Sequence, residues 1–212
     1  MTGACWHGRG DSLFYTFCRD IVLLVLGLPN RLRVSGADHV PLEGPLILAV
    51  THKSETDPLF AGVAMGRPLA YMAKIELFRI WGLRQVVTAL GAFPVDRGAG
   101  DRAALETALR VLAEGGALLM FPEGTRHRDA EVHPFLPGVG MLAIRSGAPV
   151  VPVAVKGTDH LARRWRHGPP TVRVAVGPPV DLLGLGGRKS LVYAAAAERI
   201  RSAVKELYDR LD

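Results

Sequence analysis

Short apolar runs alternate with longer amphipathic stretches along most of the chain. Residues 46–50 and 150–155 are continuous apolar runs of strand length, as expected of strands buried on both faces of a sheet. Between residues 101 and 114, apolar side chains recur at helical spacing after a capping aspartate. Similar patterns predict strands over 92–95, 117–121 and 171–176, and helices over 58–65, 139–145 and 190–211. The alternation predicts one α/β domain with a mostly parallel or mixed central sheet flanked by helices.

The N-terminal segment contains an apolar run that is too short to cross a membrane. The run covers residues 21–28, follows Arg19 and Asp20, and ends at Pro29. A spanning helix needs about 20 apolar residues, and a signal peptide would have a basic start and a cleavage site that are missing here. Two interpretations remain, a buried helix or an amphipathic helix in the membrane interface. We expect residues 1–30 to form a membrane-interface helical segment and residues 31–212 to form the folded domain.

The charge balance indicates an anionic partner. The chain has 26 Lys and Arg against 20 Asp and Glu, a formal net charge of +6, which suits a phosphate ligand, anionic lipid or nucleic acid. No run of five or more basic residues occurs, so nucleic acid is not expected. Residues 78–84 interleave apolar and basic side chains, as interfacial helices do. The plain alternative is that this segment and the run 21–28 both belong to the core.

A candidate general base follows the predicted strand 46–50. His52 stands five residues before Asp57, and Pro58 occupies the favoured first position of the next helix. On one continuous helix this spacing would place the two side chains about 140° apart, but across a strand–turn–helix corner they can meet. A carboxylate on one imidazole nitrogen fixes the tautomer and leaves the other nitrogen free as a base. The alternative is that Asp57 only caps its helix.

A second candidate site is the turn over residues 121–126, with the sequence FPEGTR. Gly124 would let backbone approach a ligand closely, and Arg126 could hold a phosphate in its guanidinium fork. Arg97 ends another strand-like stretch, and Lys74 is a lone basic residue beside apolar ones. Each basic residue also has an ordinary interpretation, as a solvated ion pair or a surface lysine with a buried stem.

Metal and redox sites are not indicated by the sequence. His127 and His133 lie six residues apart and lack the H-x-x-x-H spacing of a helical zinc pair. The two cysteines, Cys5 and Cys18, are not spaced as C-x-x-C. No G-x-G-x-x-G or Walker loop follows a predicted strand. We therefore expect no metal and no nucleotide cofactor.

Taken together, these segments resemble the glycerophospholipid acyltransferases, most closely the bacterial lysophosphatidic acid acyltransferases. The family's H-x-x-x-x-D block matches residues 52–57, its arginine-ending block matches 91–97, its F-P-E-G-T-R block matches 121–126, and its V-P-V block matches 151–155. Lys74 matches the lysine of an A-K-x-E-L stretch between the first two blocks. Order and spacing agree over roughly residues 30 to 180, and four blocks in order are far more specific than one.

The resemblance implies a catalytic pair and a substrate-binding set. His52 would act as base with Asp57 as its partner, and the substrates would be bound by Lys74, Arg97, Glu123, Gly124, Thr125 and Arg126. The donor would be an acyl thioester of coenzyme A or acyl carrier protein, with no cofactor. The acceptor would be 1-acyl-sn-glycerol 3-phosphate and the product phosphatidic acid.

Departures from the family pattern keep two alternatives open. Thr51 stands where the family usually has asparagine, and Leu136 stands where a lysine often follows Phe135. The acceptor could therefore be another lysophospholipid or a glycolipid, and a non-catalytic lipid-binding protein is an alternative from another class. In each case we expect peripheral or monotopic attachment to anionic lipid on the cytoplasmic face of the cell membrane.

Overall fold

Seven strands form one central sheet in the computed structural model, which describes residues 12–95, 102–159, 168 and 170–211. The strands are β1 (Arg33–Ser35), β2 (Leu46–Val50), β3 (Ala70–Lys74), β4 (Ala92–Val95), β5 (Ala117–Met120), β6 (Val150–Lys156) and β7 (Arg173–Val176). Their order across the sheet is β1-β7-β6-β2-β5-β3-β4. Neighbouring strands are parallel except for β6 and β7, which run antiparallel. The predicted α/β domain with a mixed sheet is confirmed.

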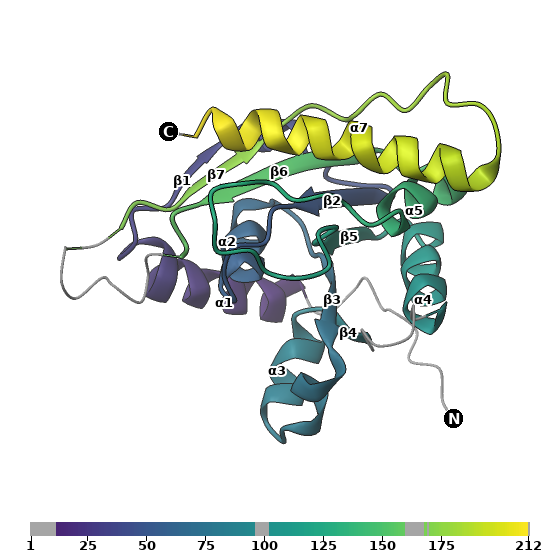
Figure 1. The fold of residues 1–212 in the computed structure, drawn as a ribbon. Helices are drawn as coiled ribbons and strands as arrows, with labels where there is room; N and C mark the ends of the chain where they lie inside the picture. Colours follow the sequence, from purple (N-terminus) through teal and green to yellow (C-terminus); the bar gives the residue numbers. More distant parts are fainter. Residues whose placement is uncertain (1–11, 96–101, 160–167, 169, 212) are drawn as a thin grey trace.

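Helices cover both faces of this sheet (Figure 1). One face is covered by α4 (Arg102–Ala113), α5 (Gly138–Ser146) and α7 (Lys189–Asp209), and the other by α1 (Ser12–Val22) and α2 (Asp57–Ala64). The helix α3 (Leu83–Ala89) lies beside β4, at the edge of the sheet. The described residues also include three short helical segments: η1 (Leu23–Gly27, π-helical), η2 (Ala37–His39) and η3 (Ile75–Arg79).

The central strand β2 contributes to a core on each face of the sheet. Ile47 and Ala49 belong to the apolar cluster under α4, α5 and α7, while Leu46, Leu48 and Val50 belong to the cluster that includes α2. Successive side chains of a strand point to opposite faces, so a strand covered on both sides is apolar throughout. Polar chemistry can therefore begin only beyond the end of β2, where the candidate site lies.

The N-terminal helical segment leaves much of its apolar surface exposed. Phe17, Leu24 and Leu28 are 61%, 63% and 66% exposed, although α1 also packs against α2 and the Tyr15 hydroxyl donates a hydrogen bond to the carbonyl of Arg67 at 3.0 Å. Among the described residues, none of the helices has both the length and the apolar character needed to cross a membrane. The division at residue 30 stays a prediction.

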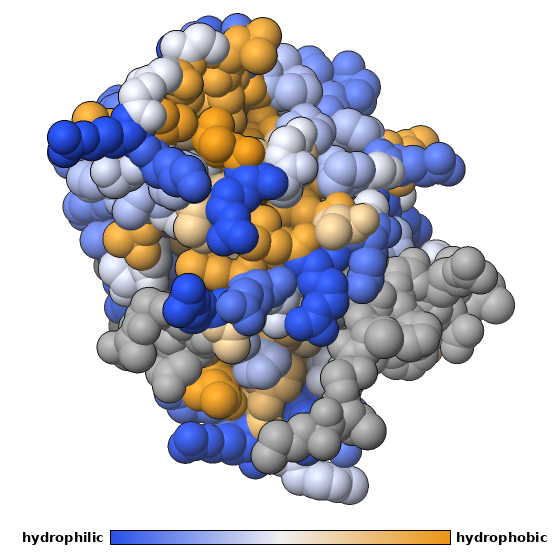
Figure 2. All heavy atoms as spheres, turned by 90° about the vertical axis from the view of Figure 1, so that its right-hand side faces the viewer, coloured by the Kyte–Doolittle hydropathy of each residue, from blue (hydrophilic) through white to orange (hydrophobic). Residues whose placement is uncertain are grey.

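Exposed apolar side chains also occur away from this segment. Figure 2 shows hydrophobic atoms gathered between charged groups on the side that lies at the right of Figure 1, where α4, α5 and the start of α7 are found. Leu191 on α7 is 64% exposed, and Trp81, after η3, is 89% exposed. Apolar exposure alone therefore does not identify a membrane-facing side, and the position of each patch relative to the site must be considered.

Candidate active site

The end of β2 brings His52 and Asp57 together, as the sequence predicts. The Thr51 hydroxyl accepts a hydrogen bond from the N–H of Val155 at 2.9 Å, so the chain stays tied to β6 up to the residue before His52. A turn then leads into α2, which begins at Asp57. The imidazole Nδ1 of His52 lies 3.2 Å from Oδ2 of Asp57. An ionised carboxylate can only accept, so the proton of this contact sits on Nδ1 and Nε2 is left as the basic nitrogen.

Asp57 is fully buried and its carboxylate is held by further donors. Oδ2 also accepts the backbone N–H groups of Lys53 and Ser54, at 2.6 and 2.7 Å. Oδ1 accepts the hydroxyl of Thr158 at 2.5 Å. Hydrogen bonds of this kind satisfy a buried carboxylate and fix its orientation. Thr158, which lies just beyond β6, is a site residue that the sequence analysis missed.

Glu123 is buried behind His52 and bonds to backbone. Its Oε1 accepts the N–H of His52 at 3.0 Å, and its Oε2 accepts the N–H of His133 at 3.2 Å. This carboxylate fixes the position of His52 and of the loop that follows β5. Both oxygens of Glu123 already accept backbone N–H groups inside the protein. Contact between Glu123 and a substrate stays a prediction.

The rest of the 121–126 turn borders His52. The Phe121 ring stacks on the His52 ring, with centroids 4.0 Å apart and an angle of 23° between the planes. Gly124 has a φ of +74°, a conformation that favours glycine. Arg126 forms an ion pair with Glu55, which precedes α2. Thr125 is exposed at the same turn.

The structure gives less detail for the other two predicted basic residues, Lys74 and Arg97. Lys74 is the last residue of β3 and follows Ala73, which lines the cavity described next. Arg97 lies outside the described residues, two positions after β4 ends at Val95. Phosphate binding by these residues stays a prediction.

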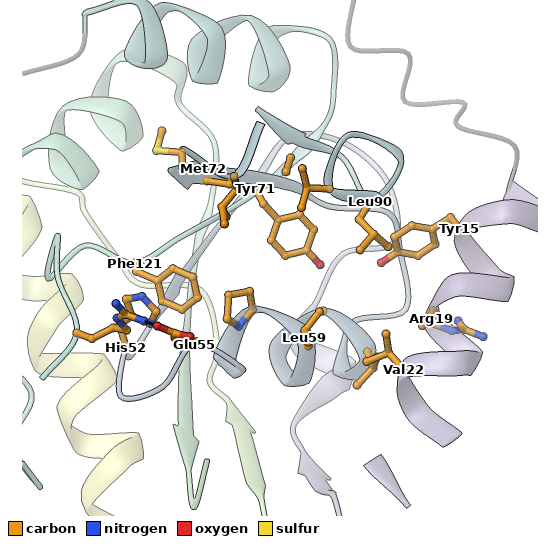
Figure 3. A pocket seen from close by; sticks show the side chains of 18 residues that line it. Tyr15, Arg19, Val22, His52, Glu55, Leu59, Tyr71, Met72, Leu90 and Phe121 are labelled. Carbon is orange, nitrogen blue, oxygen red and sulfur yellow. Dashed lines mark hydrogen bonds and ion pairs between the residues drawn. The ribbon is translucent and has the colours of Figure 1, made fainter. Parts of the chain in front are cut away.

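A largely apolar cavity of about 480 Å³ opens beside His52 and runs to the N-terminal helix (Figure 3). His52, Glu55 and Phe121 lie at one end, Leu59 and Tyr71 line the middle, and α1 forms the other end through Tyr15, Arg19 and Val22. Burial raises the pKa of Tyr71 well above its usual value, and it also raises the pKa of Tyr15. The cavity has the size and lining of a site for a mainly apolar ligand.

Three side chains of the loop after β5 gather outside this cavity. The rings of His127 and His133 stack with centroids 3.6 Å apart, and Nε2 of His133 lies 2.8 Å from Oδ2 of Asp129. The hydrogen bond from His133 is the main cause that lowers the pKa of Asp129 to about 2. Their potential ligand atoms lie within 4.8 Å of one another. However, the Lys53 ammonium lies 3.6 Å from Asp129 and would repel a cation. The expectation that the reaction needs no metal stays a prediction.

Comparison with known proteins agrees with this arrangement. The family model described as Acyltransferase matches residues 31–156. A 1-acyl-sn-glycerol-3-phosphate acyltransferase of Bacillus subtilis is 29% identical over 202 residues, which cover 93% of this chain and 98% of the relative. A protein of the same name from Limnanthes douglasii is 32% identical over 181 residues, covering 82% of this chain and 62% of the relative.

A solved structure also has the same fold. The crystal structure of the 1-acyl-sn-glycerophosphate (LPA) acyltransferase PlsC from Thermotoga maritima matches with a TM-score of 0.74 at 27% identity, over 93% of this chain and 81% of that one. The span of the family match contains His52, Asp57 and the 121–126 turn, so the resemblance first indicated by the order of the motifs is confirmed. The chain belongs to the acyltransferase family and is an enzyme of that class.

Proposed function

We propose that the enzyme transfers a fatty acyl group from a thioester to the free hydroxyl of 1-acyl-sn-glycerol 3-phosphate, forming phosphatidic acid. The observation that carries the proposal is the buried His52–Asp57 pair at one end of an apolar cavity. The relatives from Bacillus subtilis and Limnanthes douglasii are named for this acceptor, and the basic surplus of the chain suits a phosphate-bearing substrate.

The chemistry follows from the arrangement of the pair. Nε2 of His52 takes the proton of the acceptor hydroxyl as its oxygen attacks the thioester carbonyl, and Asp57 stabilises the imidazolium that forms. The tetrahedral adduct collapses by breaking the carbon–sulfur bond, and the departing thiolate takes the proton from His52. Transfer is direct, so no acyl-enzyme forms. The departing thiol would be coenzyme A or acyl carrier protein. Parallel assays with the acyl thioester of each would show which one the enzyme uses.

The two ends of the cavity suit different parts of the substrates. The apolar middle, lined by Leu59 and Tyr71, would hold a fatty acyl chain, while Arg126 lies near His52 where the acceptor phosphate would bind. A phosphomonoester carries about −1.5 to −2 charges at neutral pH, and burying it requires charged partners. Arg126 would exchange its ion pair with Glu55 for the phosphate, assisted by Lys74 and Arg97.

One observation favours a second acceptor. A Cβ atom on Gly124 would lie 2.7 Å from the Leu136 side chain, so an apolar residue covers this part of the turn where the family often has a lysine. Fewer cations near the turn would suit a phosphodiester lysolipid, which carries one negative charge and a larger head group.

Competition between acceptors tests the proposal. Purified enzyme would be offered lysophosphatidic acid, lysophosphatidylglycerol and glycerol 3-phosphate together with palmitoyl-coenzyme A, and products identified by mass spectrometry. We expect lysophosphatidic acid to have the highest kcat/KM, with no product from His52→Ala. A higher kcat/KM for either alternative would contradict the named acceptor but not the acyl transfer. Binding of these lipids without turnover would instead favour the non-catalytic lipid-binding protein.

We further propose peripheral or monotopic attachment to the cytoplasmic face of the cell membrane, through anionic lipid. Two exposed apolar segments border the cavity. The first contains Leu24 and Leu28 and follows the cavity-lining Val22, and the second contains Ile80 and Trp81 and follows the cavity-lining Leu77. A lipid acceptor and an acylated product could pass between bilayer and cavity where these segments meet the membrane.

A further inference from the structure

Lys53 is a buried lysine beside the proposed base. Its side chain is only 3% exposed. Its ammonium group lies 4.0 Å from Oε2 of Glu123 and 3.6 Å from Oδ1 of Asp129, and donates a hydrogen bond to the carbonyl of Glu131. It also lies 5.6 Å from the centre of the Tyr208 ring on α7. A buried ammonium without such partners would be strongly destabilising.

The same residue touches the groups that hold His52 on two sides. The backbone N–H of Lys53 donates to Oδ2 of Asp57, the oxygen that also contacts the His52 ring. Its ammonium faces Glu123, whose other oxygen accepts the backbone N–H of His52. Lys53 therefore lies between one carboxylate in contact with the imidazole and another in contact with the His52 backbone.

Several carboxylates surround this point among the residues that the structure describes. Burial, followed by the charges of Asp159, Asp57, Glu123 and Asp129, raises the pKa of Tyr208 to about 12. A second lysine, Lys156 at the end of β6, lies 5.1 Å from the same ring. In the described part of the chain, the titratable groups that contact Lys53 or His52, or contact their partners, include Asp57, Glu123, Asp129, His127, His133, Arg126 with Glu55, Tyr208, Lys156 and Asp159.

We propose that Lys53 is a positioning residue of the active site, which holds Glu123 and the loop after β5 behind His52 and balances the Glu123 charge. The balance rests on simple electrostatics: an unopposed carboxylate beside His52 would favour the protonated imidazolium, which cannot act as a base. This inference deepens the proposed function, on which its kinetic part rests, since it concerns the readiness of the proposed base at neutral pH.

Charge-removing variants test the balance directly. Lys53→Met keeps most of the side-chain length and removes the ammonium. We expect kcat to fall at least tenfold with little change in the acceptor KM, and the acid limb of the rate profile to move to higher pH by roughly one unit. Adding Glu123→Gln to Lys53→Met removes the unopposed carboxylate and should return the acid limb toward its original position.

A matched control separates this role from general packing. Lys156→Met removes the other lysine that lies over the Tyr208 ring, whereas the ammonium that lies against Glu123 and Asp129 is that of Lys53. We expect Lys156→Met to lower Tm and to move the acid limb of the rate profile much less than Lys53→Met does. If Lys53→Met also lowers Tm but leaves the acid limb unmoved, Lys53 is a packing residue and the inference is wrong.

A titration that needs no substrate keeps this test independent of the proposed reaction. The His52 ring signal, assigned with His52→Gln, would be followed by NMR against pH. We expect its midpoint to move up by roughly one unit in Lys53→Met and down in Glu123→Gln, where the carboxylate charge behind His52 is removed. The Glu123→Gln variant still tests the charge balance if Lys53→Met does not fold. Unmoved midpoints would overturn the inference about Lys53, whereas correct shifts without acyl transfer would overturn only the proposed function.

Discussion

At the scale of the residue, the site depends on how one carboxylate is held. Asp57 accepts from the His52 ring, two backbone N–H groups and the Thr158 hydroxyl. Asp57→Asn would replace an acceptor with an NH₂ group that faces donors, and would remove the charge that stabilises the imidazolium. We expect Asp57→Asn to lose most of the turnover and His52→Ala to lose all of it. Both variants should keep the circular dichroism spectrum of the original protein. Near-normal turnover in His52→Ala would rule out its role as the base.

The Thr158 contact can be tested with a substitution of the same shape. Thr158→Val removes the donor to Oδ1 of Asp57, and a hydrogen bond to a charged group contributes about 1.5–3 kcal/mol. Only part of this free energy would be lost from the stabilisation of the His52 imidazolium by Asp57. We therefore expect kcat to fall roughly tenfold, with KM unchanged. Thr88→Val, on the exposed surface of α3, should leave kcat unaltered. Equal rates in both variants would mean that Thr158 only stabilises the fold.

The sequence was sufficient for the catalytic pair but not for its supporting residues. His52 and Asp57 are five residues apart, so a strand–turn–helix corner determines their meeting. The partners of Asp57 and Glu123 come from distant segments: Thr158 lies beyond β6, and Lys53 meets residues of α7 and of the loop after β5. The order of strands in the sheet brings these segments together, and it cannot be obtained from local patterns. One signal in the sequence could have indicated Thr158: it is a polar residue just after β6, the strand that pairs with β2.

At the scale of the element, strongly apolar segments were predictable, whereas three short segments of mixed composition were not. The predicted strand 46–50 coincides with β2, and the predicted helix 58–65 differs from α2 by one residue at each end. The pattern of apolar and polar residues did not predict β1, β3 or α3. The first has three residues, each exposed at the sheet edge, and β3 combines alanines and a lysine, which are weak strand formers. The two strands form because neighbouring strands supply their hydrogen bonds.

Packing between α5 and α7 provides an element-scale prediction. A Cβ on Gly140 would lie 2.1 Å from the carbonyl oxygen of Tyr193, so the two helices approach closely only because this residue has no side chain. We expect Gly140→Ala to lower the free energy of unfolding by about 1–3 kcal/mol, as overpacking does. Gly138→Ala, two residues away on the same helix with nothing within 4 Å, should be neutral or slightly stabilising. Denaturant unfolding of the two variants would compare them, and equal midpoints would contradict the steric argument.

At the scale of the whole molecule, the N-terminal segment and the site lie at opposite ends of one cavity. This arrangement favours the membrane contact through Leu24 and Leu28 over one through the apolar side shown in Figure 2. We expect Leu24→Ser with Leu28→Ser to weaken flotation with anionic liposomes at low salt, since each buried leucine contributes about 1.5–3 kcal/mol. Leu183→Ser with Leu191→Ser, at residues 81% and 64% exposed, is the control. Loss of flotation only in the control pair would place the contact on the other side.

Since α1 forms one end of the cavity, the segment proposed to meet the membrane would also affect the affinity for the substrate. Tyr15 and Val22 line the cavity, while Leu24 and Leu28, further along the same segment, are exposed. Deleting the segment would therefore leave part of a bound acyl chain in water, at about 0.8 kcal/mol for each methylene. Four uncovered methylenes would weaken donor binding roughly 200-fold even in detergent solution, where no bilayer is present. A truncated enzyme would then behave as one selective for shorter chains, and its loss of activity would be mistaken for a failure to reach the membrane.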